Sequence, residues 1–244
     1  ASVPAKTGLG SSSSFSVALA KGLAAFQGRK ISKDKAARFA SNLEINILGS
    51  PIGKQDQYAA SYGGFNVIEF YPDESVHVQP ILLGFRERQT LKKHLLLFYT
   101  GITREANTVL SDQRNRVEDN IERYKQMTES IPLFEKFLFN ADMEGAGKLL
   151  HEGWLAKKQL GAKVTNKVID SLYEEGIKNG AWGGKVLGAG GGGCILFVAP
   201  PEKHTAILNS LTKIARKAGL NGFQEIPFTF TDGGADIIAN HLYD

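Results

Sequence analysis

Cysteine is almost absent from the sequence, since Cys194 is the only one among 244 residues. A lone cysteine excludes an internal disulfide framework, and with five scattered histidines it cannot build a cysteine-based zinc site. The expected compartment is therefore the reducing cytoplasm. No apolar run approaches the roughly 20 residues that a transmembrane helix requires, and no basic stretch followed by an apolar core stands at the amino terminus. We therefore expect no membrane partner.

An excess of charge of one sign is also lacking. The 29 Lys and Arg residues face 25 Asp and Glu residues, so the net charge is only +4, and the basic residues are scattered among acids without a polybasic tail. This distribution suits an anionic small molecule at least as well as nucleic acid, and we expect no nucleic-acid partner. Hydrophobic residues make up 42% of the chain, which is enough for a packed core and argues against intrinsic disorder.

A glycine- and serine-rich segment lies close to the start of the chain. Gly8-Leu9-Gly10 is followed by four serines, Ser11 to Ser14, and then by apolar residues at helical spacing. The apolar residues of this predicted helix are Phe15, Ala18, Leu19, Leu23 and Phe26. The loop therefore leads directly into a helix.

A second helix is predicted from Ser32, a common N-cap residue, to about Leu48. Its inward stripe consists of Ala36, Ala40, Leu43 and Ile47. Glu44 lies on the same stripe, which would place a carboxylate on the face meant for the core. After a loop at residues 49–57, the alternating segments 65–71 and 76–81 predict a β-hairpin.

The remainder of the chain predicts a mixed arrangement of helices and strands. Strands are expected at 94–99, 185–187, 195–199 and 223–231, and helices at 104–112, 115–130, 142–160, 165–178 and 201–218. The order from residue 94 is therefore strand, helices, strand, strand, helix, strand. This is the split βαβ order of ferredoxin-like α+β layers, and it predicts a second subdomain from about residue 85 onward.

The first glycine loop is a candidate phosphate site. Its glycines let backbone N–H groups approach an anion, and the following helix directs free amides to the same place. The serine hydroxyls add donors, and one of them could ligate Mg²⁺ beside a nucleotide. A glycine turn with a serine helix cap is an equally good interpretation of the local pattern. The segment is not a Walker A sequence, because no Gly-Lys-Ser/Thr follows at the required spacing.

Two acidic residues are further candidates. Glu44 could bind a divalent cation, although an isolated glutamate at the edge of a stripe more often reaches solvent. Asp56 lies between polar neighbours just before a short helical stretch at residues 58–61. It could accept a proton from a substrate hydroxyl or serve as an N-cap, and the local sequence does not separate these roles.

A second glycine cluster occupies residues 188–193. It matches the spacing of a dinucleotide fingerprint, but a strand follows it where a helix is required, so a Rossmann site is excluded. The alternatives are a flexible connection between strands or a close approach of backbone to a ligand phosphate or to the first loop. Arg104, at a predicted strand end, is a possible anion-binding residue.

Three segments together resemble a known family. Residues 4–12, Pro-Ala-Lys-Thr-Gly-Leu-Gly-Ser-Ser, resemble the second motif of the GHMP small-molecule kinases, residues 53–57 look like the acid-bearing loop of its sugar kinases, and residues 188–197 look like its third motif. Within that superfamily, residues 99–104 and 151–154 with Lys157 look most like the D-glycero-D-manno-heptose 7-phosphate kinases.

The resemblance implies an α+β fold with two subdomains, residues 1–84 as the remainder of the amino-terminal ATP-binding domain and residues 85–244 as the carboxyl-terminal domain. It also implies an ATP-dependent carbohydrate kinase that uses Mg²⁺ and phosphorylates the anomeric hydroxyl of a heptose 7-phosphate. The transfer of the phosphoryl group would be driven mostly by positioning of the reactants and neutralisation of their charge.

Roles for individual residues follow from the resemblance. Gly8, Leu9, Gly10, Ser11, Ser12 and Ser13 would wrap the ATP phosphates, Ser12 and Glu44 would hold Mg²⁺, and Asp56 would be the base or hydroxyl-orienting acid. Gly190, Gly191 and Gly192 would support the phosphate loop and the sugar side of the site, and Arg104 would assist in binding substrate.

We expect the family's first motif to be missing, because the given sequence starts at Ala1 and reaches the first glycine loop within ten residues. We expect the amino-terminal part of the first subdomain to be missing, apolar surface to be exposed, and activity to require a complementing amino-terminal fragment. Two alternatives stay open: a kinase for another sugar of the galactose or fucose type, and a non-catalytic remnant that only binds a ligand or partner.

Overall fold

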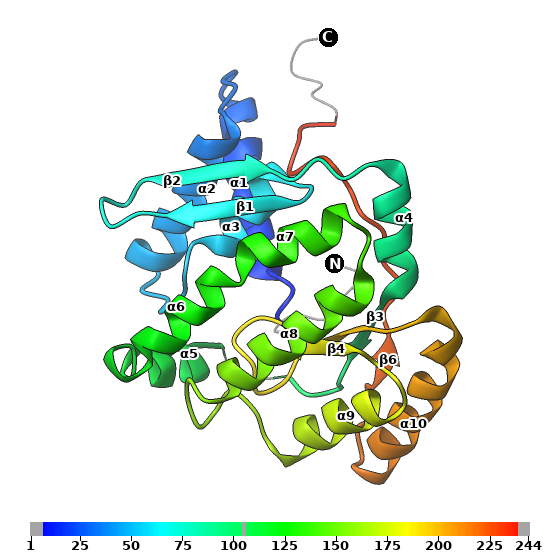
Figure 1. The fold of residues 1–244 in the computed structure, drawn as a ribbon. Helices are drawn as coiled ribbons and strands as arrows, with labels where there is room; N and C mark the ends of the chain where they lie inside the picture. The colour runs from blue at the N-terminus through cyan, green and yellow to red at the C-terminus, as the bar shows by residue number, and fades with distance from the viewer. Residues whose placement is uncertain (1–6, 104–105, 239–244) are drawn as a thin grey trace. The chain divides into compact units, whose positions relative to one another are not determined.

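The computed structural model describes residues 7–103 and 106–238 (Figure 1). These residues form two compact units, each discontinuous in sequence. The first unit consists of residues 10–82 and 230–238, and the second unit of residues 7–9 and 83–229. The division into domains 1–84 and 85–244 that the family resemblance implies stays a prediction.

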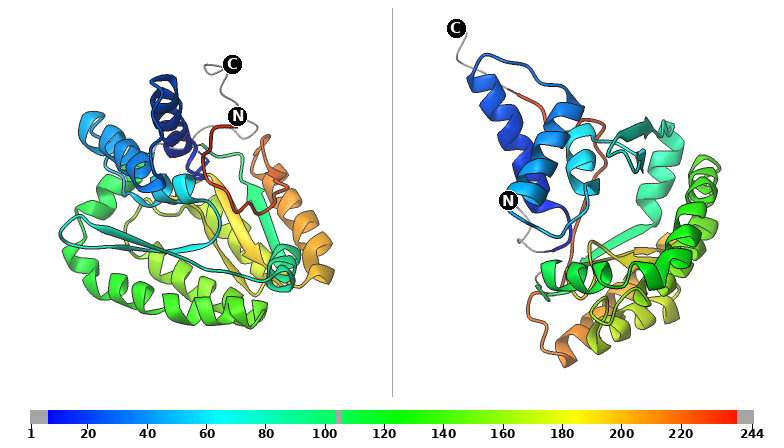
Figure 2. Two further views of the ribbon diagram at one scale, coloured as in Figure 1. Left: turned by 90° about the horizontal axis from the view of Figure 1, so that it is seen from above. Right: turned by 90° about the vertical axis from the view of Figure 1, so that its left-hand side faces the viewer.

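The first unit is built from three helices and a hairpin. Its elements are α1 (Ser11–Phe26), α2 (Lys33–Ser41), a π-helical turn (Asn42–Ile47), α3 (Gln55–Tyr62), β1 (Asn66–Phe70) and β2 (Val76–Pro80). The three helices pack against one another as neighbours (Figures 1 and 2). The predicted hairpin is confirmed, because β1 and β2 pair in antiparallel register.

Side-chain chemistry explains where these elements begin and what they bury. The hydroxyl of Ser32 accepts a hydrogen bond from the amide of Lys35, which confirms the predicted N-cap of α2. Val17 of α1 packs against Ala36 and Ala40 of α2 in a small core. The returning segment 230–238 is attached by backbone bonds, one of them from the amide of Ala235 to the carbonyl of Ala60.

The apolar stripe of α1 points to the outside of the first unit. Phe15 is 69% exposed and Phe26 is 73% exposed, whereas the buried residues of the helix are Ser13, Ser16, Val17 and Ala20. The helix was predicted correctly, and most of its predicted apolar stripe is exposed. Such a surface is characteristic of a face that binds another apolar surface.

The inward stripe of the second predicted helix is correct only in part. Ala36 and Ala40 are fully buried, but Ile47 is 68% exposed. The α-helix ends at Ser41, and the following π-helical turn has a different number of residues per turn, which changes the phase of the side chains. Glu44 remains on the buried side, with 2% of its surface exposed.

The second unit contains a four-stranded antiparallel sheet. Its strands are β3 (Leu95–Tyr99), β4 (Gly183–Val186), β5 (Cys194–Val198) and β6 (Gln224–Glu225), in the spatial order β4-β5-β3-β6. Strand β5 therefore lies between β3 and β4, which are joined by helices, and β6 lies on the other side of β3. This is the arrangement that the split βαβ order predicts, and the α+β fold class is confirmed.

Helices account for most of the remaining second unit (Figure 1). They are α4 (Phe85–His94), α5 (Ala106–Arg114), a 3₁₀ turn (Glu118–Asn120), α6 (Ile121–Glu129), α7 (Ile131–Phe139), α8 (Met143–Lys158), α9 (Lys167–Lys178), a 3₁₀ turn (Pro201–Lys203) and α10 (His204–Lys217). The core joins Phe98 and Phe197 of the sheet to Trp154 of α8, Leu172 of α9 and Leu211 of α10.

Three details of this unit differ from the sequence-based expectation. The last strand is Gln224–Glu225 rather than residues 223–231, because Pro227 has no amide hydrogen for a longer ladder. Helices α4 and α7 were not predicted, and the single helix expected over 115–130 is a turn followed by α6.

Within the described part of the chain, no helix combines the length and apolar character needed to cross a membrane.

Candidate functional site

The first glycine loop turns sharply at two glycines. Gly8 has φ +79°, and a Cβ atom there would lie 2.7 Å from the carbonyl oxygen of Leu187 in the second unit. Gly10 has φ +68° and is the N-cap of α1. Both conformations are left-handed and favour glycine. The loop geometry therefore depends on glycine for two different reasons, a close backbone approach at Gly8 and a helix entry at Gly10.

The amino end of α1 carries a concentration of donors. The first backbone bond of the helix runs from the amide of Ser14 to the carbonyl of Gly10, at 2.9 Å, and no side chain caps the helix. The amides of Ser11, Ser12 and Ser13 precede that bond and belong to the group that an α-helix leaves without an internal partner. These amides, with the positive end of the helix dipole, can bind an anion by donating hydrogen bonds to it.

Glu44 is held in a buried polar cluster of the first unit. Its Oε1 accepts a hydrogen bond from the hydroxyl of Ser12, and its Oε2 accepts one from Nε2 of Gln57 at 2.5 Å. Gln57 is fully buried, and its own Oε1 has no hydrogen-bond partner among the described residues. The alternative in which Glu44 reaches solvent is wrong, because the helix phase turns the carboxylate inward against these two partners.

Asp56 lies beside the first glycine loop. A Cβ atom on Gly10 would be 3.5 Å from the Cβ and Cγ atoms of Asp56, so the carboxyl group is next to the entry of α1. Asp56 is the second residue of α3, whose N-cap position is Lys54. Because Asp56 is inside the helix, the alternative role as its N-cap is excluded. Gly10, Ser12, Glu44 and Asp56 are therefore brought together within the first unit.

The second glycine cluster lies against the first residues of the described chain. A Cβ atom on Gly193 would lie 2.3 Å from the carbonyl oxygen of Thr7, and the amide of Cys194 donates to that oxygen at 3.0 Å. The carbonyl of Gly193 also accepts bonds from the amide and hydroxyl of Thr100. Burial raises the pKa of the Cys194 thiol to about 11, so it stays protonated under the loop.

The other glycines of the cluster are fixed by the helical side of the second unit. Gly190 has φ +98°, and a Cβ atom there would lie 2.3 Å from the carbonyl oxygen of Val164. The amide of Gly191 donates to the same oxygen at 2.6 Å, and Asn166 donates to the carbonyl of Gly191 at 3.1 Å. Gly192 is buried. The cluster is therefore an ordered turn held by backbone contacts rather than a loose connection.

One predicted site residue cannot be placed. Arg104 lies outside the described residues. Among the residues that are described, no group of three or more His, Cys, Asp or Glu side chains could hold a metal ion by itself. Oxygen ligands for a cation would therefore come from the mixed cluster of Ser12, Glu44 and Gln57, together with whatever a ligand supplies.

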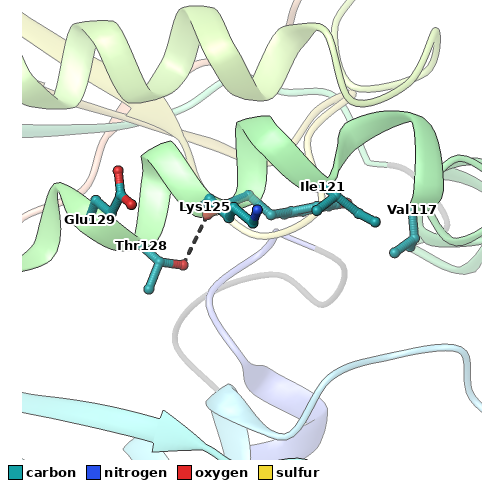
Figure 3. Close-up of a pocket in the computed structure, with 6 residues that line it drawn as sticks. Val117, Ile121, Lys125, Thr128 and Glu129 are labelled. Carbon is teal, nitrogen blue, oxygen red and sulfur yellow. Dashed lines mark hydrogen bonds between the residues drawn. The ribbon is translucent and has the colours of Figure 1, made fainter.

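A hollow on α6 had no predicted functional role. It is lined by Val117, Ile121, Tyr124, Lys125, Thr128 and Glu129, and Figure 3 shows Val117 and Ile121 along its apolar part and Glu129 at the far end of the helix. The sequence signal was present, since Val117, Ile121 and Tyr124 have helical spacing. Val117 and Ile121 are nevertheless 44% and 49% exposed, so this stripe lines an open surface instead of the core.

Comparisons with known proteins agree with the motifs. The family model for the GHMP kinases N terminal domain matches residues 1–64, and the model for the GHMP kinases C terminal domain matches residues 131–217. These two ranges together make up more than half of the chain.

Individual relatives include sugar kinases. D-glycero-alpha-D-manno-heptose 7-phosphate kinase of Campylobacter jejuni is 32% identical over 213 residues, which are 86% of this chain and 63% of that protein. The bifunctional fucokinase/GDP-fucose pyrophosphorylase of Arabidopsis thaliana is 31% identical over 82% of this chain and 19% of its own length.

A solved structure of a sugar kinase is also similar to this chain. The crystal structure of a D-glycero-D-manno-heptose 1-phosphate kinase from Bacteroides thetaiotaomicron has a TM-score of 0.71 and 27% identity, covering 95% of this chain and 63% of that one. The chain thus spans less than two thirds of the length of each of these three relatives.

Proposed function

The chain belongs to the GHMP kinase family, and from that membership we propose that it takes part in the ATP-dependent phosphorylation of a sugar hydroxyl. The observation that carries the proposal is the polar cluster in which the buried Glu44, the half-buried Asp56 and the exposed Ser12 gather around the glycine-led entry of α1. This cluster offers the three functions that phosphoryl transfer needs: a phosphate cradle, a cation site and an acid that handles the acceptor proton.

The phosphate cradle in this proposal is the loop from Gly8 to Ser13. The amides of Ser11, Ser12 and Ser13 bind the phosphates of ATP, aided by the positive end of α1. The loop keeps its shape because Gly8 contacts the carbonyl of Leu187. Gly190, Gly191 and Gly192 are proposed to support the start of the loop, Gly8 and Leu9, which belongs to the same unit. Arg104 is proposed to bind an anionic group of the substrate.

Ser12 and Glu44 are proposed to hold Mg²⁺. The residues fit such an ion, because Glu44 is a carboxylate with 2% exposure whose partners are a hydroxyl and an amide rather than a cationic side chain. The buried Oε1 of Gln57, which has no partner among the described residues, adds an oxygen beside this pair. When bound, Mg²⁺ would offset the charge of the phosphates.

Asp56 is proposed as the catalytic acid or base. It accepts the proton of the sugar hydroxyl while the hydroxyl oxygen forms a bond to the γ-phosphorus of ATP and the bond to the β-phosphate oxygen breaks, which leaves ADP. Support comes from its place beside Gly10, at the entry of α1 where the proposed phosphate cradle lies.

The proposed acceptor is the anomeric hydroxyl of D-glycero-D-manno-heptose 7-phosphate. The name and 32% identity of the C. jejuni relative support this choice. The 31% identity to a bifunctional fucokinase supports a second candidate, a kinase for fucose or another sugar. The chain spans only 63% of the C. jejuni protein. Although turnover was expected to require a complementing amino-terminal fragment, the proposal is that these 244 residues turn over ATP by themselves, and the assays below use this chain alone.

The test is an ADP-release assay with ATP, Mg²⁺ and a panel of acceptors: heptose 7-phosphate, the same heptose without phosphate, fucose and galactose. We expect ADP release with heptose 7-phosphate, and a loss of at least 100-fold in Asp56→Asn, in line with the usual contribution of a general acid or base. Asp119→Asn, an exposed aspartate in a 3₁₀ turn, is the matched control and keeps full activity. Equal rates for both variants would refute the role of Asp56, and release with fucose alone would favour the second candidate.

A further inference from the structure

Lys185 occupies an unusual place in the sheet of the second unit. It lies in β4, opposite Leu196 of β5, and Leu196 in turn lies opposite Leu97 of β3. Residues that face each other across antiparallel strands have side chains on the same side of the sheet. Lys185 therefore shares a sheet face with two leucines.

That face is apolar. The row next to Lys185 contains Cys194 opposite Tyr99, and both belong to a cluster with Leu97. Partly buried hydrophobic residues pack against this cluster; they are Leu9, Leu187, Leu196, Ile226 and Phe228. The opposite face of the sheet carries the main core with α9 and α10. A single ammonium group thus lies in otherwise apolar surroundings.

No described residue pairs with this ammonium group, although other half-buried lysines have partners. Lys158 forms an ion pair with Asp170 at 2.6 Å, Lys54 pairs with Glu74, and Lys157 donates to the carbonyl of Gly188. Burial lowers the pKa of Lys185, because nothing nearby compensates for the lost hydration of its charged form. Burial of an unpaired ammonium group costs free energy, so such a lysine is a candidate for binding an external anion.

The position of Lys185 points to the kind of anion. Two residues farther along the chain, Leu187 presents its carbonyl to Gly8, where the first glycine loop begins, and Leu9 packs on the same apolar cluster. The sheet face that carries Lys185 is therefore the one on which the proposed phosphate loop starts. Ligands of a sugar-phosphate kinase carry phosphate groups, which pair well with a desolvated ammonium group.

We propose that Lys185 is a phosphate-binding residue that pairs with a phosphate group of the reactants. This inference rests on the proposed function, and it adds a subsite that the family motifs did not indicate. The phosphate has two possible sources, the phosphate monoester of the acceptor sugar and the phosphates of the nucleotide, and the experiment below distinguishes them.

The direct test is competitive labelling of lysines with acetic anhydride on the full chain, followed by peptide mass spectrometry. The labelling is repeated with heptose 7-phosphate, with the same heptose lacking the phosphate, and with ATP and Mg²⁺. If the acceptor supplies the phosphate, heptose 7-phosphate lowers the labelling of Lys185 at least fivefold and the unphosphorylated heptose does not. Protection by ATP alone assigns the phosphate to the nucleotide. Lys148, an exposed lysine on α8 paired with Glu144, is the reference and does not change.

Lack of protection by either phosphorylated ligand would overturn the inference, as would equal protection by the unphosphorylated heptose. Labelling needs no turnover, so its outcome is separate from that of the ADP-release assay. Protection of Lys185 without ADP formation would refute the proposed function and retain the phosphate subsite. ADP formation without protection of Lys185 would support the proposed function and refute the subsite.

Two variants test the same inference through stability. Lys185→Met keeps a long unbranched side chain and removes the uncompensated charge, so we expect a higher melting temperature together with a loss of at least tenfold in affinity for the protecting ligand. Lys185→Arg keeps the charge and retains measurable binding. A lower melting temperature for Lys185→Met with unchanged ligand affinity would show that Lys185 is structural and would overturn the inference.

Discussion

Gly8 offers the sharpest quantitative test of how the first glycine loop is held. In Gly8→Ala, the new Cβ atom would lie 2.7 Å from the carbonyl oxygen of Leu187 and 3.1 Å from its carbon, and φ is +79°. A left-handed conformation costs a non-glycine residue roughly 1–2 kcal/mol. A contact with backbone cannot be relieved by a side-chain rotation, and such overpacking adds roughly 1–3 kcal/mol. We expect a total loss of about 2–5 kcal/mol in unfolding free energy.

Gly219 provides a matched control in the same unit. It has a similar φ of +71°, but a Cβ atom there would meet nothing within 4 Å. Gly219→Ala should therefore lose only the conformational part, roughly 1–2 kcal/mol. The difference between the two variants measures the close approach of Gly8 to Leu187.

Urea unfolding followed by tryptophan fluorescence is the suitable assay. Both tryptophans, Trp154 and Trp182, belong to the second unit, which also contains Gly8 and Gly219. The signal therefore reports the unit in which the substitutions act. Equal destabilisation by Gly8→Ala and Gly219→Ala would refute the close approach of Gly8 to the backbone of Leu187.

Three further predictions concern other parts of the chain. Ser32→Ala should lower the stability of the first unit by about 1 kcal/mol through loss of the α2 cap, measured by circular dichroism, and no change would contradict the cap. MgCl₂ with ATP should stabilise the unaltered chain by about 2.7 kcal/mol at a ligand concentration of 100 Kd and so raise its melting temperature. Glu44→Gln should abolish this rise in melting temperature, whereas Glu118→Gln should keep it. Because burial raises the pKa of the Cys194 thiol to about 11 from an ordinary value of 9, its contribution to stability is complete below pH 9 and is lost as pH rises toward 11. Cys194→Ala should remove part of that alkaline loss in a pH series of urea titrations, and an unchanged slope would contradict the assignment.

The sequence predicted those features that depend on local pattern. The glycine loop leading into α1, the Ser32 cap, the hairpin and the strand order of the second unit all follow from spacing and turn residues. Glu44 was recognised as a candidate because its position relative to Ala40 fixes the face on which it lies. In each case the signal is carried by neighbours within a few turns or strands.

The missed features depend on contacts or on weak local signals. Helix α4 has one buried residue, Leu91, and therefore almost no apolar stripe, whereas α7 has a proline as its second residue, which is tolerated only in a first turn. The π-helical turn that exposes Ile47 has no distinctive composition. Gln57 and Lys185 were missed because their importance lies in what surrounds them. A polar residue adjacent to Asp56 and a lysine within an apolar strand were the available signals.

The most direct test of the central claim is to identify the product by ³¹P NMR. The full 244-residue chain is incubated with ATP, Mg²⁺ and heptose 7-phosphate. Phosphoryl transfer predicts a new resonance from a phosphate on the anomeric oxygen, formed in equal amount with ADP and absent with Asp56→Asn. Unchanged ATP, or release of inorganic phosphate with the sugar unmodified, would contradict the claim that this chain phosphorylates a sugar.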